Sequence, residues 1–253
     1  MKVTFLGTGT SQGVPVIGCN CEVCLSLDFR DKRLRTSIHL DIQGQSWVVD
    51  TGPDFRQQML REHVQRLDAV IFTHAHRDHT AGLDDVRAYN FLQQMDMPIY
   101  GTKPTLDQLR IEYAYAFEKN APLGLPRLNL HEIDAKPFSI QGIEIIPLPV
   151  MHLRMPVLGF RFGNFSYITD ANFIPDETLE RLKGTEILVL NALQHERHVS
   201  HFNLTEALAM AEKINPGKTY LLHMSHKLGL HATIEKRLPG NVALAYDGLQ
   251  LDI

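Results

Sequence analysis

The segment at residues 74–79 constrains this chain more than any other part of its sequence, because it reads His-x-His-x-Asp-His. It follows the apolar run at residues 69–72, which predicts a buried strand, so the segment lies on the loop at the strand's carboxyl end. One metal ion cannot easily use four such side chains, whereas two neighbouring ions can, as in two-metal hydrolytic sites. A histidine-rich surface loop is the alternative. The candidate ligands are His74, His76, Asp78 and His79.

The composition is that of a globular protein with a sizeable core, since 44% of the 253 residues are hydrophobic and 21% are charged. A net charge of −4 argues against a broad nucleic-acid-binding surface, although a local basic patch is compatible with it. The 13 histidines exceed ordinary usage, and this excess favours metal chemistry. The sequence therefore points to a metalloprotein that does not act mainly by gripping nucleic acid.

Targeting signals are not recognisable in the sequence. No stretch approaches the ~20 apolar residues of a membrane span, and the apolar segment at residues 3–6 is too short for a signal peptide. We therefore expect a cytoplasmic protein without a membrane partner.

Three cysteines, Cys19, Cys21 and Cys24, lie too close together for an ordinary disulfide framework. Three thiols at this spacing suit a tetrahedral zinc ion that takes one more ligand from elsewhere in the chain. Three unrelated free cysteines are the alternative, because the spacing departs from the usual Cys-x₂-Cys. A glycine-rich stretch precedes them at residues 7–13, and it predicts a tight turn beside the active site rather than a phosphate-binding loop.

The order of the predicted elements is strands and then a helix, given twice. No linker, repeat or charge block divides the sequence. This pattern predicts an α/β fold with two mixed sheets face to face and helices outside, in a four-layer αββα sandwich. We expect one domain over residues 1–253, with a small zinc-binding insertion near residues 18–26. The predicted strands are at residues 37–42, 46–50, 67–73, 98–101, 143–150, 157–162, 165–169, 186–190, 218–222, 242–246 and 249–252, and the helices at 54–64, 82–94, 105–117, 175–183 and from Asn203 onward.

Three further candidate ligands, His152, Asp170 and His223, each come directly after an apolar run. Side chains at the ends of strands converge on one rim of a sheet, where functional loops gather. A single histidine at such a place is more often a surface or core residue than a ligand. Three such positions after the histidine-rich loop favour a shared metal site.

This ordered set of residues resembles the metallo-β-lactamase superfamily, whose phosphodiesterase branch carries the same histidine motif and a bridging aspartate. Within that branch the chain resembles the PhnP-type phosphoribosyl cyclic phosphodiesterases. The closer resemblance is carried by Cys19-x-Cys21-x-x-Cys24 together with His226, by Leu-His-Met-Ser-His at residues 222–226, and by a His-x-x-Leu segment that starts at His201.

The resemblance implies which side chains bind metal. One active-site ion, Mn²⁺ or Zn²⁺, would be held by His74, His76 and His152. The second would be held by Asp78, His79 and His223, with Asp170 bridging both. A structural Zn²⁺ would be bound by Cys19, Cys21, Cys24 and His226.

The same resemblance implies a chemical mechanism, with Asp78 and His201 as the catalytic residues. Two cations lower the pKa of a bridging water, and the resulting hydroxide attacks phosphorus. His201 would protonate the leaving ribose oxygen as a general acid, or it would only orient the phosphate. The expected substrate is a small phosphodiester such as phosphoribosyl 1,2-cyclic phosphate.

Other functions remain open at this stage. One is a phosphodiesterase on RNA 3′ ends, as in the transfer RNA processing nucleases, or on cyclic nucleotides, although we find no long arm for gripping tRNA. Another is a thioester or lactone hydrolase of the same fold, and a third is a metal-binding scaffold without catalysis. A homodimer is compatible with the sequence. His195 and His198 are interpreted as loop residues, and Arg154 and Lys227 as surface charges that could contact phosphate.

Overall fold

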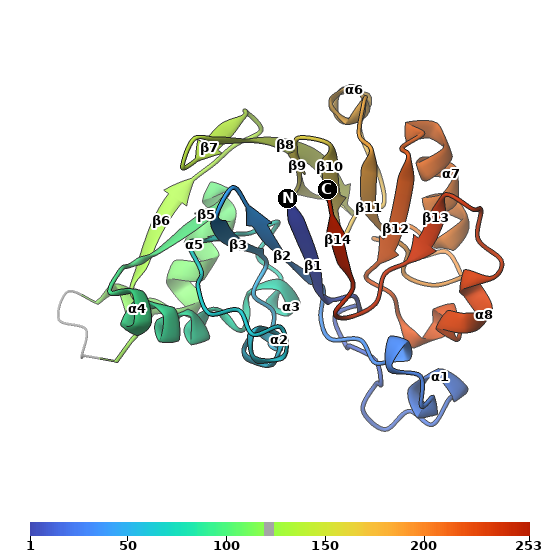
Figure 1. The fold of residues 1–253 in the computed structure, drawn as a ribbon, viewed down its shortest axis with the longest axis horizontal. Helices are drawn as coiled ribbons and strands as arrows, with labels where there is room; N and C mark the ends of the chain where they lie inside the picture. The colour runs from blue at the N-terminus through green and yellow to red at the C-terminus, as the bar shows by residue number, and fades with distance from the viewer. Residues whose placement is uncertain (119–123) are drawn as a thin grey trace. The chain divides into compact units, whose positions relative to one another are not determined.

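The computed structural model describes residues 1–118 and 124–253, and it divides into two compact units, each built on one seven-stranded sheet (Figure 1). The α/β fold class with two mixed sheets and helices is as predicted, whereas the single-domain assignment stays a prediction. Within the described residues, no helix is both long and apolar enough to cross a bilayer. The first unit comprises Met1–Gly7, Ser37–Asp134 and Gly248–Ile253, and the second comprises Thr8–Thr36 and Ala135–Asp247.

The sheet of the first unit has the strand order β14-β1-β2-β3-β4-β5-β6. Neighbours from β14 to β3 are antiparallel, and those from β3 to β6 are parallel. Its strands are β1 (Lys2–Gly7), β2 (Ser37–Ile42), β3 (Gln45–Val49), β4 (Ala69–Ile71), β5 (Met97–Gly101), β6 (Leu128–Glu132) and β14 (Gln250–Asp252). Its helices are α2 (Phe55–Arg61), α3 (Arg77–Thr80), α4 (Arg87–Gln93) and α5 (Lys103–Glu112), with 3₁₀ turns at Leu83–Val86 and Ala114–Phe117.

The β2–β3 hairpin and the buried strand β4 carry the local structure that positions the histidine-rich loop. Gln43 and Gly44 both have positive φ, as a two-residue hairpin turn requires, and they join the strands predicted at residues 37–42 and 46–50. Strand β4 is fully buried but shorter than predicted. Beside the strand, the carboxylate of Asp68 accepts a hydrogen bond from the backbone of Ser46, and the backbone of Thr73 donates to the carboxylate of Asp50.

The sheet of the second unit has the order β13-β12-β11-β10-β9-β8-β7. Strands β7 to β10 pair antiparallel and β10 to β13 pair parallel. Strand β12 has the predicted bounds. The strands are β7 (Phe138–Ile140), β8 (Ile143–His152), β9 (Met155–Phe162), β10 (Phe165–Ile168), β11 (Ile187–Asn191), β12 (Lys218–Leu222) and β13 (Val242–Leu244). The helices are α1 (Glu22–Leu25), α6 (Asp176–Leu182), α7 (Leu204–Ile214) and α8 (His231–Glu235), with 3₁₀ turns at Phe29–Asp31 and His226–Leu228.

The last two strands flank Asp247-Gly248 but belong to different sheets. Strand β13 pairs with β12, whereas β14 pairs with β1, beside which it lies in Figure 1. The carboxylate of Asp247 accepts hydrogen bonds from the backbone of Thr8 and of Leu34, so it is tied to its own unit and does not close a hairpin. The two predicted strands on either side of Asp247-Gly248 therefore pair with different partners, although they are adjacent in sequence.

Candidate active site

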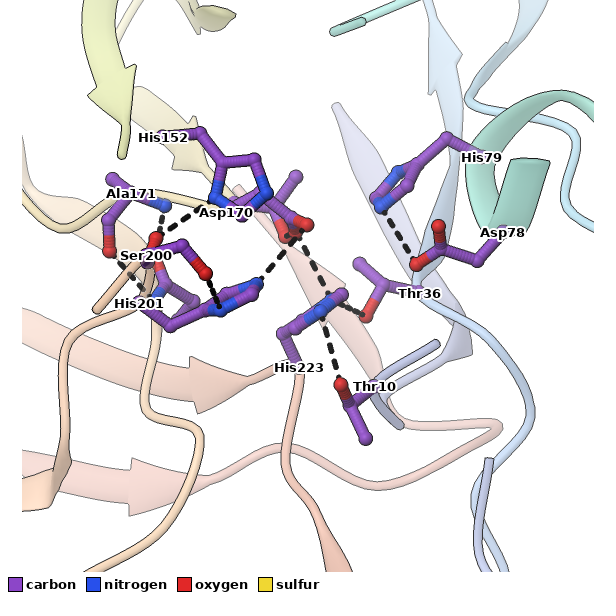
Figure 2. Close-up of polar contacts among 12 residues, drawn as sticks. Thr10, Thr36, Asp78, His79, His152, Asp170, Ala171, Ser200, His201 and His223 are labelled. Carbon is purple, nitrogen blue, oxygen red and sulfur yellow. Dashed lines mark hydrogen bonds and ion pairs between the residues drawn. The ribbon is translucent and has the colours of Figure 1, made fainter. Parts of the chain in front are cut away.

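The histidine-rich loop of the first unit brings its imidazoles together directly after β4. The ring centroid of His74 lies 4.6 Å from that of His76 and 4.3 Å from that of His79. Nε2 of His79 lies 3.3 Å from Oδ2 of Asp78, as Figure 2 also shows. His76 caps helix α3 with extended backbone angles, so the chain turns there and Asp78 and His79 fall in the helix's single turn. All four predicted ligands of this loop therefore lie in one cluster.

Asp50, directly after β3, fixes the orientation of two of these histidines. Its Oδ2 accepts a hydrogen bond of 2.8 Å from Nδ1 of His79, and both side chains are fully buried. The same oxygen accepts from the hydroxyl of Thr73 at 2.8 Å, so that hydroxyl oxygen can only accept from Nδ1 of His74, 2.9 Å away. Both imidazoles thus carry their proton on Nδ1, and Nε2 keeps the lone pair that a metal ion needs.

Burial raises the pKa of Asp50, while the contacts with His79 and Thr73 lower it. Burying a carboxylate costs free energy unless it is hydrogen-bonded. Here its side-chain donors are His79, a candidate ligand, and Thr73, which orients His74. Sequence reasoning missed Asp50, because its place at the end of a strand is the only signal that marks it.

In the second unit, Asp170 is surrounded by three histidines from separate segments (Figure 2). Its Oδ1 lies 3.1 Å from Nδ1 of His223, and its Oδ2 lies 3.3 Å from Nε2 of His201. The ring of His201 stacks on that of His223 at 5.0 Å and meets that of His152 edge to face at 4.6 Å. The predicted strand-end residues of this unit are therefore neighbours, and His201 lies among them.

Several groups in the second unit hold these side chains in place. Nδ1 of His152 donates to the carbonyl of Ser200 at 2.8 Å, which leaves Nε2 as its lone-pair nitrogen. Asn191, at the end of β11, accepts from the backbone N–H of Ala171 and donates to its carbonyl, so the backbone next to Asp170 is pinned on both sides. The backbone of Phe202 also donates to Ala171, which anchors the segment carrying His201.

The glycine-rich stretch supports His223, and its prediction as a turn is confirmed. Gly9 bridges Arg35 on one side and Met224 on the other, and a Cβ at Gly9 would lie 2.8 Å from the carbonyl of Arg33. This close approach places the hydroxyl of Thr10 3.3 Å from Nε2 of His223.

The three cysteines surround one nitrogen of a histidine, all within the second unit. Nδ1 of His226 lies 3.2, 3.3 and 3.5 Å from the sulfurs of Cys19, Cys21 and Cys24. Sulfur and nitrogen ligands of a tetrahedral zinc ion lie about 3.5 Å apart, so the spacing fits that ion. A hydrogen bond from the backbone of Cys24 lowers the pKa of the Cys21 thiol to about 6, whereas burial raises that of Cys24 to about 11. The four predicted ligands are thus grouped as expected.

The two other histidines of the loop that carries His201 differ from each other. His195 is exposed, as expected for a loop residue. Nδ1 of His198, in contrast, lies 3.2 Å from Nδ1 of His201, and burial, followed by the influence of His201, lowers the pKa of His198. His198 therefore contacts His201 directly, whereas the sequence analysis interpreted it only as a loop residue.

Comparison with known proteins identifies the family. The family model of the β-lactamase superfamily domain matches residues 46–224. The crystal structure of a diphosphatase from the PhnP family is 39% identical, with a TM-score of 0.93, and the match covers 100% of this chain and 97% of that one. The chain therefore belongs to the metallo-β-lactamase superfamily, and its similarity to that diphosphatase supports the predicted likeness to the PhnP-type enzymes. Its fold class, two mixed sheets with helices, is the one predicted from the sequence.

Curated relatives carry other names. An octanoyltransferase of Porphyromonas gingivalis is 38% identical over 253 residues, which is 99% of this chain but only 51% of that protein. A ribonuclease Z of Listeria innocua is 30% identical over 136 residues, 48% of this chain and 40% of that protein. The chain thus spans about half the length of these relatives or less, and their names describe larger proteins.

The donor residues fit the divalent metal ions that the superfamily fold implies. Imidazole nitrogens and carboxylate oxygens suit Zn²⁺ and Mn²⁺ alike. In each unit the imidazoles are oriented by oxygen acceptors, an arrangement typical of metal-ligating histidines.

Replacing Asp50 by asparagine tests this orientation. The new side-chain amide could donate a hydrogen bond to Nδ1 of His79, which would favour the wrong tautomer of that imidazole, so we expect the affinity for Zn²⁺ or Mn²⁺ to fall by about 10- to 100-fold. Calorimetric titration of the metal-free protein measures it. Replacing Asp41, an exposed strand residue of the same unit, by asparagine is the control. Unaltered metal affinity in Asp50→Asn would contradict the assigned role.

Proposed function

We propose that this chain is a metal-dependent phosphodiesterase that hydrolyses a small cyclic phosphodiester such as phosphoribosyl 1,2-cyclic phosphate. The observation that carries the proposal is the position of His201, whose Nε2 lies 3.3 Å from Oδ2 of Asp170. An imidazole next to a metal-binding carboxylate is placed to give a proton to an oxygen leaving phosphorus. The similarity to a PhnP-family diphosphatase supports chemistry at phosphorus.

The metal ligands are proposed as a set of seven side chains. The loop histidines of the first unit and the strand-end residues of the second supply the donors. When bound, two divalent cations lower the pKa of water and neutralise charge that develops on the phosphoryl oxygens. The proposed ligands are His74, His76 and His152 for one ion, Asp78, His79 and His223 for the other, and Asp170 for both.

The chain's own residues orient the acid. Nδ1 of His201 lies 3.0 Å from the hydroxyl of Ser200, and the side chain is 11% exposed. Ser200 also holds His152 through its carbonyl. One residue therefore positions both a proposed ligand and the proposed acid, and Nε2 of His201 faces Oδ2 of Asp170.

A screen of the metal-reconstituted enzyme tests the function. It compares phosphoribosyl 1,2-cyclic phosphate, cyclic nucleotides, an RNA with a 3′ extension, bis(p-nitrophenyl) phosphate and a diphosphate ester. We expect the small cyclic phosphate to have the highest kcat/KM. Cleavage of bis(p-nitrophenyl) phosphate without cleavage of the cyclic sugar phosphate would keep the reaction class and overturn the substrate. Cleavage of the diphosphate alone would overturn the phosphodiesterase assignment.

Replacing His201 by alanine should lower kcat by about 10²- to 10⁴-fold, because the leaving alkoxide then receives no proton. The metal content should not change, since His201 is not a proposed ligand. His195→Ala is the matched control on the same loop and should retain full activity. If His201→Ala turns over as fast as the parent enzyme, the acid lies elsewhere.

A thioester hydrolase is a second candidate, favoured by one observation. The chain matches half of an octanoyltransferase along nearly its whole length. A thiol has a pKa of about 8.5, so a thiolate leaves without an acid. Hydrolysis of octanoyl thioesters by the parent enzyme, with little loss in His201→Ala, would favour this candidate over the phosphodiesterase.

We further propose that the cysteine cluster binds a structural Zn²⁺. Cys21→Ser should remove one zinc per chain and lower the midpoint of thermal unfolding, while the active-site ions remain. Metal analysis by mass spectrometry and a melting curve measure the two effects. If Cys21→Ser keeps every zinc of the parent protein, the cluster is not a zinc site.

A further inference from the structure

Helix α3 carries two of the proposed metal ligands, Asp78 and His79, in a single turn over Arg77–Thr80. A helix of one turn is not stable by itself, because forming the first hydrogen bond fixes several residues at once. Contacts from outside the turn must therefore hold these two side chains in place.

One side of the turn is held by the backbone of Thr51, which follows Asp50 after strand β3. The N–H of Thr51 donates to the carbonyl of His79 at 2.8 Å, and its carbonyl accepts from the N–H of Gly82 at 2.9 Å. Both contacts are made by the backbone, so a side-chain substitution elsewhere in the unit leaves them available.

The other side of the turn is held by the C-terminal end of α5. Oε2 of Glu112 accepts a hydrogen bond of 2.6 Å from the guanidinium of Arg77. The hydroxyl of Thr80 lies 3.4 Å from the same oxygen and 3.2 Å from the carbonyl of His76. The hydroxyl of Tyr113 donates to the carbonyl of Thr80 at 2.7 Å, and it thereby satisfies one of the carbonyls that a helix end leaves open. Both ends of the turn are thus tied to α5.

Glu112 and Tyr113 are themselves fixed by their surroundings. Oε1 of Glu112 accepts from the side-chain amide of Gln108 at 3.0 Å, and the side chain of Glu112 is 12% exposed. Tyr113 belongs to the apolar core of the first unit, together with Leu106 and Leu109 of the same helix. Burial raises the pKa of Tyr113 to about 12, so its hydroxyl keeps the proton that it donates. The end of α5 is therefore a rigid support for the turn.

Arg77 connects this support to the histidine motif. It stands between His76 and Asp78 in the sequence, and its side chain is 62% exposed. An ion pair with one exposed partner contributes little to stability. Its consequence is geometric, because it fixes the residue that lies between two proposed ligands.

We propose that Glu112 and Tyr113 are positioning residues of the metal site. They hold the turn that presents Asp78 and His79, and so they set the affinity for the ion that these two side chains would bind. The proposal rests on the ligand set given with the proposed function. Removing groups that orient metal ligands from outside commonly lowers metal affinity by about 10- to 100-fold.

The test is a calorimetric titration of Mn²⁺ into the protein freed of its active-site ions. Mn²⁺ is the probe because thiolate ligands select softer metals. The parent protein should bind in two steps, and His79→Ala should abolish the step that belongs to Asp78 and His79. Glu112→Ala and Tyr113→Phe should each weaken that step by about 10-fold and leave the other step unchanged.

Two further variants separate positioning from a general loss of structure. Glu112→Gln keeps an oxygen acceptor at the same place and should retain most of the Mn²⁺ affinity. Asp107→Asn is the matched control, because it changes an exposed carboxylate of the same helix that pairs with Lys103 and Arg110. It should alter neither binding step.

Equal weakening of both steps, or full affinity in Glu112→Ala and Tyr113→Phe, would overturn the assignment. Tyr113→Phe removes one oxygen and keeps the ring in the core, so it decides the matter if Glu112→Ala does not fold. A parent protein that binds no Mn²⁺ would overturn the ligand set and the positioning role together. If the parent binds both ions but cleaves no phosphodiester, the proposed function fails, and the affinities of the variants still decide the role of α5.

Discussion

The arrangement of the histidines in the first unit depends on the hydrogen bonds of one buried carboxylate, that of Asp50. It accepts hydrogen bonds from the backbone and hydroxyl of Thr73 and from Nδ1 of His79. Strands β3 and β4 run parallel, so their carboxyl ends lie at one edge of the sheet and Asp50 meets Thr73 there. Without these donors a buried charge would be costly. The same hydrogen bonds that stabilise the fold therefore determine which nitrogen each of these histidines would offer to a metal ion.

In the second unit, the parallel strands β10, β11 and β12 bring the proposed site residues together at their carboxyl ends. Asp170 follows the first, Asn191 ends the second and His223 follows the third. Because these ends lie side by side, side chains far apart in the sequence meet without a long loop. Asn172, two residues beyond Asp170, accepts from the backbone of Leu153 and donates to that of Val199, so one short segment carries a proposed metal ligand and an amide that braces its surroundings.

The sequence predicted the candidate ligands better than the groups that hold them. Histidine and cysteine are uncommon, so their spacing carries information, and the clusters around His79, Asp170 and His226 formed as expected. Asp50 and Asn191 are common residue types whose roles arise from neighbours distant in sequence, and their position at a strand end is the only local signal that marks them. The sequence did not show that β13 and β14 belong to different sheets, because strand pairing depends on contacts across the whole fold.

Three residues of the proposed chemistry share one backbone feature. Asp50, Asp170 and His223 each follow a strand and have positive φ, at 65°, 55° and 57°. This conformation is unfavourable for side chains other than glycine and persists only where the surroundings impose it. Glycine at any of them would relax the backbone while removing the functional group. Selection for stability alone would therefore favour the loss of these three side chains, whereas selection for the proposed chemistry would keep them.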